Sequence, residues 1–175
     1  MTMKKILVIS TIIFSFTNVK SQCFGNLFIN GSFSDTVGKA IIAPGWNGTG
    51  TPDVNDVSGL LFTTSGYTWT GTPISSANGG TWQNLFSSAE SVQQTINVIP
   101  NKLYSLSFEY AAQGIHSDTI IFYDNPVGIN TYIDGVLSFT TPDDTTQYTW
   151  ESANYIFSTS NSVVTIKFSP TQTVQ

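Results

Sequence analysis

The sequence carries little charge, and almost none of it is positive. Its 175 residues include six lysines and no arginine, against eleven acidic residues. Charged residues make up 10% of the chain, compared with about 25% in an average domain. Nucleic acids and anionic membrane surfaces are bound mainly through lysine and arginine, so both classes of partner are effectively excluded. The abundant small polar and aromatic residues suit an extracellular β-domain and the recognition of neutral polar ligands such as sugars.

The sequence also lacks an apolar run long enough to span a bilayer. The run Ile6–Phe16 has 11 residues, whereas a membrane helix needs about 20. Lys4 and Lys5 precede it, and Val19-Lys20-Ser21 follows it with short side chains at the positions that a signal peptidase reads. We therefore expect residues 1–21 to be a secretory signal peptide and the protein to be secreted or held at the cell surface. The remaining residues, 22–175, are one domain with three lysines, eleven acids and a formal charge of −8.

Cysteine and histidine occur once each. Cys23 has no partner for an internal disulfide, and lipid attachment is disfavoured because Gln22 stands where a small residue is preferred. His116 precedes Ser117 and Asp118, but neighbours on a strand point to opposite faces, so the run supplies no triad geometry. A solvated histidine in a loop is the simpler interpretation, and a place at the rim of a binding face is the alternative.

Helical periodicity is absent, and two strand patterns within Val92–Ala112 dominate the chain. One face of the first pattern carries Val92, Gln94, Ile96 and Val98. One face of the second carries Tyr104, Leu106, Phe108 and Tyr110, which we expect in the core. Pro100-Asn101-Lys102 separates the two patterns and predicts a tight turn.

Other strands are predicted by β-branched and aromatic content. They cover Thr81–Phe86, Thr119–Tyr123, Thr131–Ile133, Val136–Thr140, Tyr148–Phe157 and Ser162–Phe168. Asp134-Gly135 is the strongest hairpin signal. Residues 47–59 and 63–81 are predicted as long loops, which are uncommon in compact domains unless they are functional. About eight short strands separated by turns predict an all-β fold, a two-sheet antiparallel jelly-roll sandwich.

Five segments carry a family likeness. In order they are NLFINGSF from Asn26, APGW from Ala43, QQTINVIPNKLYSLSFEYA from Gln93, YIDGV from Tyr132, and W-x-x-x-x-Y-x-F from Trp150 before V-T-I-x-F. The order resembles galactose-binding-like jelly-roll domains of secreted bacterial proteins, among them carbohydrate-binding modules. The resemblance covers most of residues 26–168. It implies a β-sandwich with Trp46 in its core, and Leu27, Ile29 and Phe33 are also expected to be buried.

The same family often holds a structural calcium ion, and two departures bear on it. The glutamate that follows Asn-Gly-x-Phe in the family is Ser34 here, with Asp35 next. The acidic pair that closes family members has no counterpart in Ser169–Gln175. A structural calcium ion therefore stays an open alternative without assigned ligands. One further expectation is that the domain lacks its last strand.

Aromatic side chains among small polar residues suggest a sugar site. A sugar offers C–H groups on its faces and hydroxyls at its edge, so a site needs a flat apolar surface beside neutral donors and acceptors. The predicted ligand-binding residues are Trp69, Trp82, Tyr67, Gln83, Asn84 and His116. For each aromatic residue the alternative is burial in the core. Trp150 fits either interpretation.

Catalysis has weak support in the sequence. Glu109 and Glu151 could form a glycosidase pair, but no spacing argument brings them to either of the usual separations, so we expect no enzyme. The leading hypothesis is a secreted, non-catalytic carbohydrate-binding module that recognises a neutral glycan or polysaccharide through aromatic platforms. The alternative is a structural or adhesive cell-surface β-sandwich without a small-molecule ligand, whose partners are other surface proteins.

Overall fold

The computed structural model describes residues 25–58, 67–69, 75–76, 79–85, 88–112, 115–117, 121–122, 127–144 and 149–171. For residues 67–69, 115–117 and 121–122 it describes the backbone only. The predicted signal peptide, Gln22 and Cys23 lie outside the described residues.

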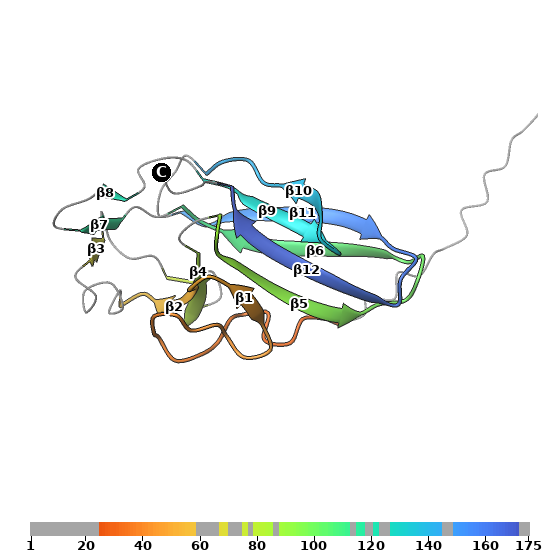
Figure 1. Ribbon diagram of the computed structural model, residues 1–175, viewed down its shortest axis with the longest axis horizontal. Helices are drawn as coiled ribbons and strands as arrows, with labels where there is room; N and C mark the ends of the chain where they lie inside the picture. Colours follow the sequence, from red (N-terminus) through yellow and green to blue (C-terminus); the bar gives the residue numbers. More distant parts are fainter. Residues whose placement is uncertain are drawn as a thin grey trace, which may run out of the picture.

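Within these residues the regular elements are all strands. They are β1 Asn47–Thr49, β2 Asp53–Asp56, β3 Tyr67–Trp69, β4 Thr81–Asn84, β5 Ser91–Asn97, β6 Leu103–Tyr110, β7 Ile115–Ser117, β8 Ile121–Phe122, β9 Ile129–Ile133, β10 Val136–Thr140, β11 Glu151–Ser158 and β12 Val163–Pro170. One sheet has the order β1-β5-β12-β9-β10, and three smaller sheets pair β6 with β11, β2 with β4, and β3-β7-β8 (Figure 1). Each pairing is antiparallel.

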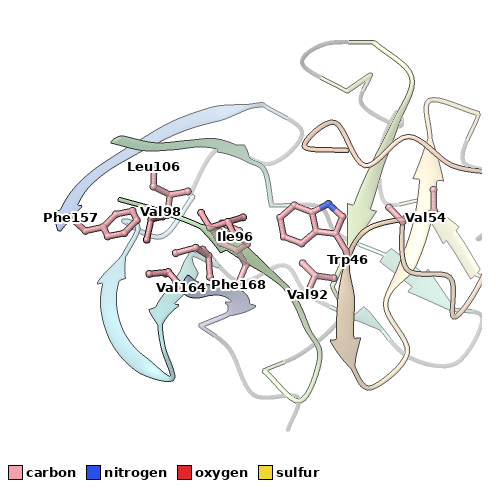
Figure 2. Packing of buried hydrophobic residues seen from close by; sticks show 11 residues of the cluster. Trp46, Val54, Val92, Ile96, Val98, Leu106, Phe157, Val164 and Phe168 are labelled. Atoms are coloured by element: carbon pink, nitrogen blue, oxygen red, sulfur yellow. The ribbon is translucent and has the colours of Figure 1, made fainter. Parts of the chain in front are cut away.

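The five-stranded sheet and the β6/β11 sheet pack against each other through their apolar faces. Val164 and Ile166 of β12 are fully buried, and Leu106 and Phe157 come from the facing sheet (Figure 2). The ring of Phe168 contacts Phe108 across the layers, with centroids 5.0 Å apart. The all-β antiparallel sandwich predicted from the sequence is confirmed.

The dominant pattern in Val92–Ala112 has the predicted faces. The four inward residues predicted around β5 are all buried, although Val98 lies just after the strand. On β6, Leu106 and Tyr110 are buried while Tyr104 and Phe108 are half-buried. Asn101 takes a left-handed conformation at φ 61°, as its place in the turn predicts. However, β5 pairs with β1 and β12, whereas β6 pairs with β11. The turn therefore carries the chain from one layer to the other.

The second predicted turn is a two-residue hairpin. Asp134 and Gly135 have φ angles of 50° and 81° between β9 and β10, as the primed turns of tight hairpins require. The Asp134 carboxylate accepts from the Thr165 amide at 2.9 Å and from the Asn161 side chain at 3.0 Å. These bonds fix the hairpin against the start of β12.

Several sequence predictions need correction. The predicted loops contain β1, β2 and β3, which are too short to show an alternating pattern. The strand predicted over Thr81–Phe86 ends at Asn84, and β8 is the described part of Thr119–Tyr123. Ile29 is 71% exposed, because the bend at Asn30 turns it outward while Phe28 stacks on Trp46. Trp46 itself is buried as predicted.

One buried polar side chain ties the N-terminal segment to the sandwich. Gln94 is buried on the inner face of β5, and its oxygen accepts from the Ile29 amide at 2.7 Å. Its nitrogen donates to the carbonyls of Ile29, at 2.9 Å, and Gly45, at 2.8 Å. All three bonds go to backbone groups of residues 29–45, which a glutamine can satisfy and an apolar residue cannot.

We expect Leu106→Ala to lower the free energy of unfolding by about 2–5 kcal/mol, the usual range for a buried leucine. Urea denaturation of the mature domain measures the change. A loss under about 1 kcal/mol would contradict the inward register of β6.

We expect Gln94→Leu to destabilise the fold by at least about 1–3 kcal/mol, because it leaves buried backbone groups without partners. Gln93→Leu is the matched control, since Gln93 is the neighbour on the opposite face of β5. The control should change stability by less than about 0.5 kcal/mol. Equal losses in both variants would rule out the proposed role of the Gln94 amide.

Candidate functional site

Three of the predicted site residues lie on paired strands. In the β3/β7 pair, Tyr67 is opposite Ser117, Thr68 is opposite His116, and Trp69 is opposite Ile115. The backbone therefore brings Tyr67, Trp69 and His116 onto adjacent strands, although their side chains lie outside the described residues. His116 belongs to strand β7, so its predicted place in a loop is wrong.

The other three lie on β4, whose pairing with β2 sorts them onto two faces. Asn55 lies opposite Trp82, and Asp53 lies opposite Asn84. Opposed residues of an antiparallel pair share a face, so these four side chains lie on one side of the pair, which we call the β2/β4 face. Asp53, Asn55 and Trp82 are buried there, and Asn84 is half-buried. Gln83 is on the other side of β4, opposite Val54, which belongs to the main core.

Two indoles meet at the β2/β4 face. Trp82 is 7% exposed, so its side chain is buried and is not the exposed platform that one interpretation of the sequence predicted. Trp150, half-buried just before β11, meets Trp82 edge to face with ring centroids 6.3 Å apart. The Trp150 indole nitrogen donates to the carbonyl of Ser75. Trp150 is the member of this pair with more ring surface open to a ligand.

Gln83 has a structural role that the sequence prediction missed. Its nitrogen donates to the carbonyls of Asp53, at 2.7 Å, and Ile41, at 3.0 Å, and its oxygen accepts from the Ala43 amide at 3.1 Å. The amide thus joins β4 to residues 41–43, as Gln94 joins β5 to residues 29–45. These three bonds pair both polar atoms of the Gln83 amide with backbone groups, so Gln83 is poorly placed to distinguish one sugar from another.

The β2/β4 face includes a buried carboxylate. Asp53 is buried, and its oxygen accepts from the Ala40 amide at 2.7 Å. Burial raises the pKa of the Asp53 carboxyl above its ordinary value of 3.8; the Ala40 hydrogen bond opposes that rise, and the charge on Glu90 adds to it. Lys39 lowers the pKa of the same carboxyl. Burial therefore disfavours the charged form of this carboxyl.

The two glutamates considered for catalysis are neighbours but do not converge. Glu109 of β6 is paired with Ser152, and Glu151 of β11 is paired with Tyr110. Adjacent positions on a strand alternate in direction, so the two side chains leave opposite faces of the β6/β11 sheet. This arrangement does not support a glycosidase pair.

Two kinds of feature are absent from the described part of the chain. It contains no group of three or more His, Cys, Asp or Glu side chains that could hold a metal ion. Nor does any helix there have the length and apolar character to cross a membrane.

Comparisons with known proteins add a likeness of fold. No protein-family model and no curated protein sequence matches the chain. The structure is similar to the native structure of a family 35 carbohydrate binding module from Clostridium thermocellum, with a TM-score of 0.43 and 12% sequence identity. The match covers 71% of this chain and 89% of that one.

The raised pKa of Asp53 predicts how stability changes with pH. Above pH 3.8 the unfolded chain has lost this proton while the folded protein still holds it, so stability falls as the pH rises through the folded pKa. Asp53→Asn keeps an oxygen for the Ala40 amide and removes the ionisation. We expect the variant to gain stability over the wild type between pH 3 and 7, measured by urea denaturation at several pH values. A variant that is less stable by the same amount at every pH would contradict this.

Proposed function

We propose that the protein is a secreted, non-catalytic carbohydrate-binding module for a neutral glycan or polysaccharide. The observation that supports this most strongly is the contact of Trp82 with Trp150 on a face that also carries Asn55 and Asn84. Indole rings offer flat apolar surface to the C–H groups of a sugar, and amides supply neutral donors and acceptors for its hydroxyls.

The β3/β7 pair supplies further residues of the same kind. Tyr67 and Trp69 occupy register positions on one face of this pair and add aromatic residues to the candidate set, whereas His116, opposite Thr68, belongs to the other face. We propose that Tyr67 and Trp69 complete the binding site. The low charge of the mature chain also favours a neutral ligand, because recognition has to rest on rings and hydrogen bonds rather than on ion pairs.

A second candidate, an adhesive surface domain, is favoured by one observation. Large apolar side chains are exposed at the end of the sandwich where three turns meet: Ile99, Leu103, Val136 and Val163. The turns are joined there by bonds from the Asn101 amide to the Thr159 carbonyl and from Asn161 to Asp134. Such a patch suits contact with another protein.

A panel of glycans and insoluble polysaccharides, titrated with the mature domain, separates the two candidates. We expect at least one neutral glycan to bind and Trp69→Ala and Trp150→Ala each to weaken it about tenfold, the equivalent of ~1.4 kcal/mol. Tyr132→Ala is the control, since Tyr132 lies on the five-stranded sheet under the Lys167 ammonium group, 4.2 Å from its ring centroid. Binding to no glycan would favour the adhesive domain, and equal losses in all three variants would move the site elsewhere.

A further inference from the structure

We propose that Asn55 is the residue that selects the sugar, by donating a hydrogen bond from Nδ2 to one oxygen of the ligand. This inference rests on the proposed function and assigns a specific contact within it. The sequence prediction did not include Asn55.

The Asn55 amide is buried, and one of its two polar atoms has no hydrogen-bond partner. The residue is 0% exposed, and its Oδ1 accepts from the Asp56 amide at 2.9 Å. Its Nδ2 has no hydrogen-bond partner. Buried polar atoms are nearly always paired, because leaving a donor unsatisfied costs free energy that folding has to offset. An unpaired buried donor therefore indicates an acceptor that a ligand supplies.

Its position identifies the acceptor. Asn55 lies opposite Trp82 in the β2/β4 register, and Trp82 contacts Trp150, so the unpaired donor shares a face with the indole pair. One other buried side-chain atom in the described part of the chain is unpaired, the hydroxyl of Thr131. That residue is opposite Phe168 in the five-stranded sheet, within the sandwich core. Asn55 is thus the unpaired group that belongs to the candidate site.

The chemistry favours discrimination at one position of the sugar. Nδ2 can only donate, so the ligand has to present an oxygen that accepts, and we infer that this oxygen is a hydroxyl of the sugar. In the unliganded protein this donor has no bond to lose, so a ligand bond to it is a net gain. A ligand without the oxygen leaves the donor unpaired, and sites built in this way reject deoxy analogues strongly.

The test compares sugars that differ by one hydroxyl. Glucose, galactose, mannose and xylose, each with its monodeoxy analogues, are titrated into the wild type and Asn55→Leu, with tryptophan fluorescence as the readout. In the wild type we expect one monodeoxy analogue of the bound sugar to bind at least about tenfold more weakly than its parent. The Asn55→Leu variant should bind the parent sugar only as tightly as it binds that analogue, while it still discriminates at every other hydroxyl. Asn97→Leu, on an exposed position of β5, is the control and should bind as the wild type does.

The outcomes are distinct. If Asn55 only supports the fold, the variant will bind the parent and all analogues more weakly by one common factor, and the inference is wrong while the proposed function stands. If the wild type binds none of these sugars and none of the glycans in the panel, the proposed function fails and takes the inference with it. Should Asn55→Leu not fold, NMR of the wild type replaces it: the side-chain amide protons of Asn55 should shift on saturation with the bound sugar, and unchanged resonances would overturn the proposal.

Discussion

The burial of one face of β5 is the constraint on which the rest of the structure depends. β5 pairs with both β1 and β12, and its inner residues meet Leu106 and Phe157 of the opposite layer. The one polar side chain on that face, Gln94, holds residues 29–45 by three hydrogen bonds to backbone groups. Gln83 does the same from β4 to residues 41–43. The segment before β1 is therefore fastened to the sandwich and to the β2/β4 pair, which places the candidate site relative to the core.

The sequence predicted the long strands well because their alternation is a local signal. The inward faces of β5 and β6 and the hairpin at Asp134-Gly135 follow from residues within a few positions of one another. The short strands could not be predicted in this way, since the pairing of β3 with β7 joins segments far apart in sequence. The same limit explains why His116 was predicted to lie in a loop, since its neighbours in the sequence do not reveal the strand with which it pairs. The layer change after β5 was also missed, because a tight turn looks the same whether its strands share a sheet or not.

At the site, some of the residue types could be predicted from the sequence, but little of their use could be. Gln83 and Asn84 looked equivalent beside Trp82, but alternation sends Gln83 to the core side of β4, where backbone groups take its whole amide. Asn55 stands in the run Asp-Val-Asn-Asp, which favours a loop, and its burial comes from pairing with a distant tryptophan. Which amides are satisfied within the fold depends on contacts across the sequence, so composition alone cannot separate structural amides from those left for a ligand.

A protein with so few cations has to recognise its partner through short-range contacts. Ring surfaces supply affinity with little choice among sugars, since every sugar has C–H groups, so selectivity has to come from hydrogen bonds that only some ligands complete. Local departures from the rules of stable folding are expected at functional sites, where the loss is offset elsewhere in the structure. An unpaired amide nitrogen in a fully buried residue is such a departure, and here it lies on the face that carries the indole pair. The unpaired donor of Asn55 lowers the stability of the free protein. The same donor gives the site its preference for one sugar over another, because only some sugars can pair with it.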